Sequence, residues 1–327
     1  MHRILFFIVL VSNFAVAQVQ RHRAVTLMGS RFDITIEAKD SLSAEKYIDE
    51  SIAEIERIEN LISEWRPQTQ ISEVNRNAGI KPVKVDKEVI RLTQSGIYFS
   101  KLTDGAFDIS IVAMDKIWKF DGSMTTMPSA EAIKKSVEKV GYQNIEIDTI
   151  TSTIYLKKPG MKIGFGSIGK GYAADKTREL MESKGVKAGI INASGDLTTW
   201  GKQYNGKYWT VGITNPFKND DYAEVFKLKR FAVTTSGNYE KFVEFDGKRY
   251  SHIINPKTGM PSTGICSASV FGPSAEVANG FSTSIIVLGV DDGLKLLAKF
   301  PEYSCVLITD KGKIIKSKNF KKRKFIK

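Results

Sequence analysis

The amino-acid sequence predicts an α+β fold in which mixed sheets pack against helices. Several segments place apolar residues at the three- and four-residue spacing of a helix. Others alternate or run apolar over a few residues, as strands do, and the two kinds of segment follow one another without a strict βαβ rhythm. With 327 residues, of which 42% are hydrophobic, the chain can bury a substantial core.

The first half of the chain combines both patterns. The segment Ala24–Ala38 alternates like a strand. The next segment repeats isoleucine at helical spacing from Ile48 to Ile62, with Ser43 as its expected N-cap. The other elements expected here are a helix over Lys87–Leu102, a helix opened by Ser129 and Glu131, and a hairpin over Ile145–Leu156.

The second half is expected to be richer in strands. Gly185 ends a helix over Tyr172–Lys184. Strands are expected at Ala188–Asn192, Tyr208–Thr214, Glu224–Leu228, Phe231–Ser236 and Phe242–Asp246, then helices at Ala275–Leu288 and Asp292–Phe300, and a last hairpin near Ser304–Ile315. Cys266 and Cys305 lie in apolar strand-like runs, where a disulfide and two buried thiols are both compatible with the sequence.

The first 17 residues have the pattern of a secretory signal peptide. His2 and Arg3 precede the apolar run Ile4–Val11, and Ala15-Val16-Ala17 supplies the small residues of a cleavage site. The run is shorter than the roughly 20 residues that span a bilayer, which disfavours a membrane anchor. No cysteine lies near Ala17 for lipid attachment, so we expect a protein that is exported to the periplasm and soluble after cleavage.

The formal net charge of +12 is unevenly distributed, because lysines and an arginine crowd into residues 311–327. We expect this segment to be a basic C-terminal tail. Such a tail attracts an anionic membrane surface or an acidic partner, and a solvated terminus without a partner is the alternative. No nucleic-acid partner is expected, because no recognised binding motif accompanies the charge.

The stretch from Gly164 to Gly171, GFGSIGKG, matches GxGxxG and nearly matches a Walker A loop. Gly171 stands where the Walker motif needs a hydroxyl, and no acidic residue follows a strand in the Rossmann manner. What remains is a glycine-rich turn before a helix with Lys170 beside it, which is suited to binding phosphate. The alternative is a tight strand-to-helix turn with a surface lysine.

His252 is the one histidine away from the N-terminal region, since the other two are His2 and His22. A histidine can act as a general base near neutral pH. Taken alone, a histidine in a strand that runs into a turn is also compatible with a structural role.

Several short motifs occur in one order along the chain, and together they are specific. They are Met28-Gly29-Ser30, Ser63–Pro67 with Ile71–Asn75, Thr103–Asp108, Ser167–Asp175, Asn192–Asp196, Thr235–Gly237, Tyr250–Gly259 and Ser282-Thr283. In this set the chain resembles the ApbE family of FAD:protein FMN transferases. The resemblance implies one ApbE-like, T-fold-related flavin transferase domain over residues 18–310.

The resemblance also implies roles for individual residues. His252 would be the catalytic base. FAD, the substrate, would be held by Met28, Trp65, Ala106, Phe107, Asp108, Lys170 and Ile254. Mg²⁺ would be bound by the backbone carbonyl of Ser167 and by the side chains of Asn279 and Thr283. The implied partner is a flavin-accepting exported redox protein or subunit, and the oligomeric state stays open.

Three positions depart from the family pattern by losing a carboxylate. Asn279, Gly164 and Asn255 each stand where the family has Asp. Because Mg²⁺ usually takes one or two carboxylates besides phosphates and waters, we expect weaker metal binding, or a metal held largely by FAD. Three functions therefore remain open: FMN transfer to a Thr or Ser hydroxyl with release of AMP, hydrolysis of FAD to FMN and AMP, and flavin binding without turnover.

Overall fold

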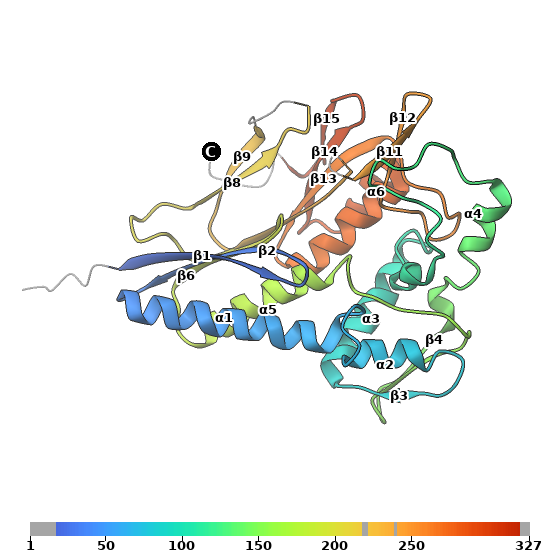
Figure 1. Cartoon of the computed structure of the whole chain (residues 1–327). Coiled ribbons are helices and arrows are strands. Elements are labelled where there is room, and N and C mark those ends of the chain that lie inside the picture. The colour runs from blue at the N-terminus through green and yellow to red at the C-terminus, as the bar shows by residue number, and fades with distance from the viewer. Residues whose placement is uncertain (1–17, 218–221, 239–240, 321–327) are drawn as a thin grey trace, which may run out of the picture.

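The computed structural model describes residues 18–217, 222–238 and 241–320 (Figure 1). The helices are α1 (Ser41–Ile62), α2 (Gln70–Arg76), α3 (Lys87–Leu102), α4 (Ala130–Ser136), α5 (Gly169–Ser183) and α6 (Ala275–Leu297), with 3-10 turns at Ile109–Ala113 and Tyr142–Asn144. The strands are β1 (Val19–Leu27), β2 (Ser30–Ala38), β3 (Val83–Lys84), β4 (Ile145–Asp148), β5 (Thr153–Leu156), β6 (Ala188–Ala193), β7 (Asp196–Trp200), β8 (Trp209–Thr214), β9 (Tyr222–Leu228), β10 (Phe231–Gly237), β11 (Phe242–Phe245), β12 (Lys248–Ser251), β13 (Ile265–Gly272), β14 (Ser304–Thr309) and β15 (Ile314–Lys316).

An eight-stranded antiparallel sheet forms the centre of the fold. Its strand order is β1-β2-β6-β7-β10-β13-β14-β15, and smaller sheets flank it, so the expected α+β class is confirmed. In the part of the chain that the structure describes, no helix is long and apolar enough to cross a bilayer. The signal peptide expected at residues 1–17 lies outside the described residues.

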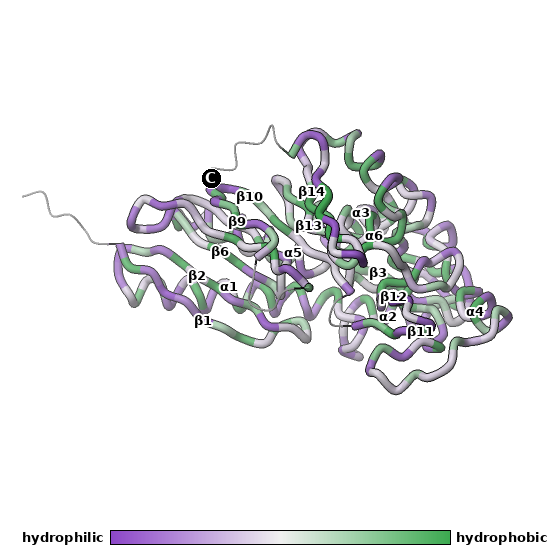
Figure 2. The backbone as a smooth tube through the Cα atoms, turned by 90° about the horizontal axis from the view of Figure 1, so that it is seen from above, coloured by the Kyte–Doolittle hydropathy of each residue, from purple (hydrophilic) through white to green (hydrophobic). Residues whose placement is uncertain are grey.

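Three helices cover one face of this sheet. α1 packs on β1 and β2, α5 on β6 and β7, and α6 on β10 and β13 (Figure 1). The isoleucine spacing of α1 buries Ile48, Ile55 and Ile62 on a single side of the helix. Figure 2 shows hydrophobic residues concentrated where α6 meets β13 and β14. Since each fully buried isoleucine contributes about 1.5–3 kcal/mol, this layer holds the helices firmly against the sheet.

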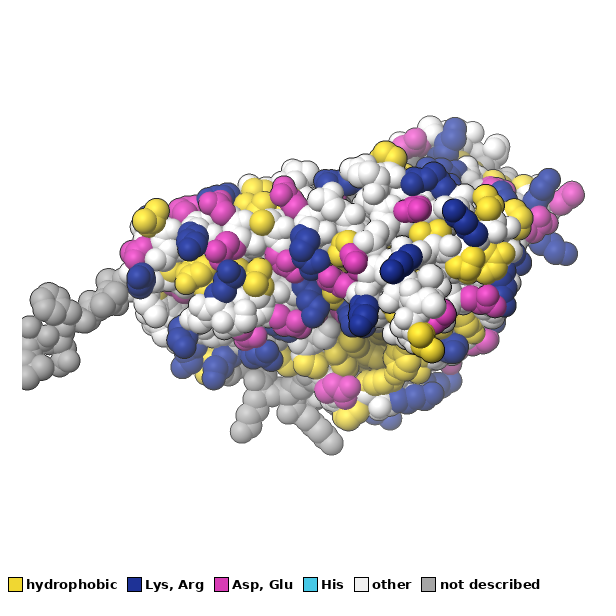
Figure 3. Space-filling model, turned by 90° about the horizontal axis from the view of Figure 1, so that it is seen from below, with side chains coloured by type: hydrophobic (Ala, Val, Ile, Leu, Met, Phe, Trp, Pro, Cys, Tyr) yellow, Lys and Arg dark blue, Asp and Glu magenta, His cyan; other side chains and the backbone are white. Residues whose placement is uncertain are grey.

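The opposite face of the sheet is covered by the β8–β9 hairpin and by Phe320. The rings of Phe226 and Phe271 meet edge to face at 4.8 Å, and Phe320 packs 5.5 Å from Phe271. Before Phe320 the chain forms β15, which pairs with β14, and Lys316 forms an ion pair with Glu224. The first part of the segment expected as a basic tail is therefore folded onto the sheet, and residues 321–327 lie outside the described residues. On the face drawn in Figure 3, Lys and Arg are interspersed with Asp and Glu, so the positive charge does not form one continuous patch there.

Two local expectations were wrong. The segment Ala24–Ala38 is a hairpin of β1 and β2 rather than one strand, because Met28 and Gly29 turn the chain with positive φ angles of 50° and 67°. The N-cap of α1 is Asp40, whose carboxylate accepts a hydrogen bond from the backbone N–H of Ser43 at 2.7 Å. Cys266 and Cys305 are both buried free thiols, and Cys305 pairs with Val270 in the β13–β14 register, so they do not form a disulfide.

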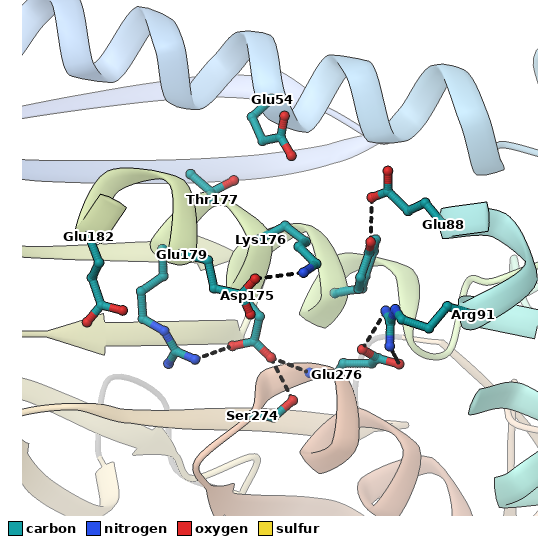
Figure 4. A network of polar contacts seen from close by, with 12 residues as sticks. Glu54, Glu88, Arg91, Asp175, Lys176, Thr177, Glu179, Glu182, Ser274 and Glu276 are labelled. Atoms are coloured by element: carbon teal, nitrogen blue, oxygen red, sulfur yellow. Dashed lines mark hydrogen bonds and ion pairs between the residues drawn. The ribbon is translucent and has the colours of Figure 1, made fainter. Parts of the chain in front are cut away.

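The crossing of α5 over the start of α6 explains part of the glycine-rich stretch. A Cβ on Gly171 would lie 2.5 Å from the carbonyl oxygen of Ala275, so only glycine allows the helices to approach this closely. One turn further along α5, the buried carboxylate of Asp175 accepts hydrogen bonds from the Ser274 hydroxyl at 2.7 Å and from the Glu276 N–H at 3.1 Å (Figure 4). It also forms an ion pair with Arg178 at 3.1 Å. These contacts fix the first turn of α6 relative to α5.

Candidate active site

The residues predicted from the sequence to serve the site line two adjoining recesses beside α5 and α6. One is a cavity of about 560 Å³, lined among others by Trp65, Ala106, Phe107, Asp108, Ser167, Lys170, His252, Ile254, Asn279 and Thr283. The other, of about 810 Å³, shares Trp65, Lys170 and His252 with the first and adds Met28. Segments far apart in sequence thus bring all the predicted side chains together, while their individual roles stay predictions.

The glycine-rich turn forms one wall of the cavity at the N-terminus of α5. Gly166 has open space where a Cβ would stand, so a ligand can approach the backbone closely there. The Lys170 side chain lines the same wall. The N–H of Gly169 donates to the Phe165 carbonyl at 2.6 Å, so the positive end of the helix dipole and the lysine are what favour an anion such as phosphate here. In this stretch Gly166 leaves room at the cavity, whereas Gly171 serves helix packing.

The floor of the cavity is polar and buried. The Asp196 carboxylate on β7 is 3.5 Å from Lys170 Nζ, and it accepts a hydrogen bond from Asn279 Nδ2 at 3.3 Å. Burial raises the pKa of Asp196 to about 6, although the nearby lysine acts in the opposite direction. Asn279 Oδ1 is buried and has no hydrogen-bond partner in the described part of the chain. One helical turn further, Thr283 contacts the Ser236 hydroxyl at 3.3 Å.

His252 lies where the two recesses meet. Its Nδ1 is 3.2 Å from the backbone carbonyl oxygen of Lys241, and because a carbonyl can only accept, Nδ1 carries the proton in this contact. The other ring nitrogen, Nε2, is then the acceptor of the neutral imidazole. The surrounding protein, which displaces water from the ring, lowers the pKa of His252; the Lys241 carbonyl opposes this, and the charges of Lys241 and Lys170 add to it. A lowered pKa favours the neutral imidazole, which is the form that can accept a proton.

Aromatic residues form the outer part of the cavity. Trp65 is 76% exposed at the mouth, and the Lys116 ammonium lies 5.2 Å from its ring centroid. A large exposed aromatic ring beside a cavity offers a stacking surface to a planar ligand. Trp118 donates from Nε1 to the carbonyl of Gly259 at 2.9 Å, which ties the 114–120 loop to the turn after His252.

The carboxylate of Asp108 is already engaged within the protein. One oxygen accepts from the N–H and the hydroxyl of Ser110, and the other accepts from the N–H of Tyr142. Burial raises the pKa of Asp108. Asp108 therefore shapes the cavity wall by capping the 3-10 turn that follows it.

The three departures from the family pattern have different surroundings. Asn255 lines neither recess; its side chain accepts from the N–H of Lys257 at 2.9 Å and closes a turn. A Cβ on Gly164 would lie 3.0 Å from the carboxyl carbon of Glu64, so another carboxylate occupies that space. Asn279 lies beside Asp196. Carboxylates therefore remain next to two of the three positions, and the expected loss of charge around one site is smaller than the sequence suggests.

Glu59 is a contributor to the site that sequence reasoning missed. Its Oε2, on the last turn of α1, accepts from the backbone N–H of Met28 and pairs with Arg66, each at 3.0 Å. One carboxylate thus fixes both the strained turn at Met28 and the loop that carries Trp65. The contact with Met28 spans 31 positions of sequence, and a helical glutamate gives no local sign of it.

Replacing Glu59 by glutamine is expected to weaken FAD binding about tenfold, because a hydrogen bond to a charged group contributes roughly 1.5–3 kcal/mol. Arg66 would lose its ion pair, and the Met28 turn and the Trp65 loop would no longer share one anchor. A titration of flavin fluorescence measures the affinity. Glu54→Gln is the matched control, since Glu54 on the same helix pairs with Arg57 away from the recesses. Unchanged affinity in Glu59→Gln would show that the two segments hold themselves in place.

Comparison with known proteins supports the resemblance that the ordered motifs indicate. The ApbE family profile matches residues 28–307. A FAD:protein FMN transferase of Klebsiella pneumoniae is 30% identical over 297 residues, which cover 90% of this chain and 90% of that protein. One of Treponema pallidum is 29% identical, with 80% and 76% covered. The crystal structure of the ApbE protein from Thermotoga maritima matches with a TM-score of 0.83 at 28% identity and covers 93% of this chain and 98% of that one.

Proposed function

The chain belongs to the ApbE family, and from this membership we propose that it transfers FMN from FAD to a Thr or Ser hydroxyl of another protein, with release of AMP. The observation that carries the proposal is the meeting of Lys170, His252 and the start of α5 around one cavity. An anion-binding helix start and a neutral imidazole base are the two groups that such a phosphoryl-type transfer needs.

In the proposed reaction, the acceptor hydroxyl oxygen forms a bond to the phosphorus of the FMN half of FAD. The anhydride bond from that phosphorus to the bridging oxygen breaks, and AMP leaves with the electron pair. His252 Nε2 accepts the hydroxyl proton, while the Lys241 carbonyl keeps the ring oriented through Nδ1. Lys170 and the backbone of Gly166 and Ser167, which line the cavity before α5, hold the diphosphate. Trp65, at the mouth, offers its ring to the flavin.

Mg²⁺ is the metal that we propose for this site, held by the Ser167 carbonyl, Asn279 and Thr283. Within the described ranges no three His, Cys, Asp or Glu side chains gather into a metal site. The buried Oδ1 of Asn279, which has no partner among the described residues, nevertheless fits a cation, because Mg²⁺ takes oxygen ligands and the phosphates of FAD would add negative charge. When bound, such an ion spreads the negative charge that develops on the diphosphate.

The cellular context is also a proposal. We propose that residues 1–17 direct export to the periplasm, that residues 18–310 act as one flavin transferase domain, and that the acceptor is an exported redox protein or subunit. The lysine-rich end of the chain supports peripheral contact with an anionic membrane.

Incubation of the purified protein with FAD, Mg²⁺ and a flavin-accepting domain tests the function. We expect covalent flavin fluorescence on the acceptor and one AMP released for each flavin attached. AMP and FMN without labelled acceptor would indicate a hydrolase instead. Tight FAD binding with neither product, at any metal concentration, would indicate a flavin-binding protein without turnover, a result that the amide at Asn279 makes worth testing.

The pH dependence of transfer follows from the lowered pKa of His252. The base is active when neutral, so lowering its pKa extends activity to lower pH. We expect kcat/KM to rise with pH through a midpoint below 6.5 and to be level above it, since this quantity reports the free enzyme. Initial rates from pH 5 to 8 measure the midpoint. A midpoint above 6.5 would contradict the assignment of His252 as the base.

A further inference from the structure

Asp196 is a buried carboxylate that lines the cavity. It ends the Asn192–Asp196 motif, but neither that motif nor the proposed mechanism assigns it a role. It begins β7, it is 3% exposed, and it lines the same cavity as Ser167, Asn279 and Thr283. A buried carboxylate is costly unless a positive group neutralises it. Its nearest cation, Lys170, stands 3.5 Å away, which is longer than a normal charge-assisted hydrogen bond.

The contact between Asp196 and Asn279 orients the amide. Asn279 Nδ2 donates to Asp196 Oδ1 at 3.3 Å, and the reverse orientation would place two acceptor oxygens together. The amide oxygen Oδ1 is consequently left buried, with no partner among the residues that the structure describes. An unsatisfied buried acceptor costs free energy, so such an atom beside a carboxylate indicates a place where a positive group binds.

We propose that Asp196 supplies the carboxylate of the cation site, so that a divalent ion is held by Asp196 on β7 together with the amide oxygen of Asn279 and the hydroxyl of Thr283 on α6. This inference rests on the proposed function, because the phosphates of FAD complete the ligand set. Asn279 and Thr283 are four residues apart on α6 and therefore lie on the same face of the helix. One charged ligand from a neighbouring strand provides what the amide on α6 lacks, and it meets the usual requirement of Mg²⁺ for one or two carboxylates.

Exchanging the carboxylate and the amide between positions 196 and 279 tests the proposal. Titration calorimetry with Mg²⁺, in the presence of FAD and without an acceptor protein, gives the cation affinity of each variant. Asp196→Asn is expected to weaken Mg²⁺ binding at least tenfold. The double variant Asp196→Asn with Asn279→Asp is expected to recover the affinity to within a few fold of the parent, because amide and carboxylate exchange places around the same ion.

Asp115→Asn is the matched control, since Asp115 is a half-exposed carboxylate that lines the same cavity and pairs with Lys139. It should leave Mg²⁺ affinity unchanged. Thermal unfolding confirms that each variant is folded. Unaltered Mg²⁺ affinity in Asp196→Asn, or a loss that the folded double variant does not recover, would overturn the proposal.

The two proposals fail in different ways. If no acceptor is labelled but Asp196→Asn still weakens Mg²⁺ binding, the transferase proposal is rejected and the cation site is supported. If the protein transfers FMN efficiently but Asp196→Asn binds Mg²⁺ as tightly as the parent, only the cation site is rejected.

Discussion

Replacing His252 by alanine is expected to lower the rate of FMN transfer by about 10²–10⁴-fold, the usual contribution of a general base. Among the described residues no hydrogen bond engages Nε2, the acceptor nitrogen of the ring, and Nδ1 donates to the Lys241 carbonyl. Alanine removes the proton acceptor and leaves the start of α5 and Lys170 unchanged. Transfer measured by in-gel flavin fluorescence should therefore fall, while FAD affinity stays within a few fold of the parent.

His22→Ala serves as the control for His252→Ala. His22 lies on β1, pairs with Asp33 at 3.0 Å, and lines neither recess. Its loss should leave transfer unaffected. If His252→Ala retained the parent rate at saturating FAD, another group would have to accept the hydroxyl proton, and the proposed mechanism would be wrong.

Local structure was largely predictable because it follows from local patterns. The helix over Lys87–Leu102 was predicted with the bounds that the structure shows. Ser129 caps α4 as expected, its hydroxyl accepting from the N–H of Ala132. Gly185, with a φ of 80°, ends α5. The sequence did not predict β7, which is a strand because it lies between β6 and β10.

The grouping of the candidate residues around one cavity was predictable only through the ordered motifs. No periodicity indicates that Lys170, His252 and Thr283 meet, because the sheet brings their elements together. The resemblance supplied the residues but not the contacts between them. Glu59 and Asp196 act through partners 31 and 83 positions away in sequence. Such contacts depend on the packed fold, so a single sequence does not reveal them.

Replacing Asp175 by alanine is expected to destabilise the protein by about 3–5 kcal/mol, because breaking a buried ion pair leaves the other charge uncompensated. Asp175 and Arg178 are 5% and 4% exposed. The substitution also removes the acceptor for the Ser274 hydroxyl and the Glu276 N–H at the start of α6 (Figure 4). The free energy of unfolding in urea measures the loss.

Two further variants separate charge from hydrogen bonding. Asp175→Asn keeps an acceptor oxygen and should lose less than the alanine variant. Lys176→Ala, at the next position of α5, removes a surface ion pair with Glu179 and a cation–π contact with the Tyr172 ring, and it should cost about 1 kcal/mol. A loss below 1 kcal/mol in Asp175→Ala would show that the contacts of Asp175 do not hold α6 in place. A loss of about 3–5 kcal/mol would mean that one motif, from Ser167 to Asp175, both lines the cavity and anchors the helix that carries Asn279 and Thr283. Folding and binding would then depend on the same short stretch of sequence.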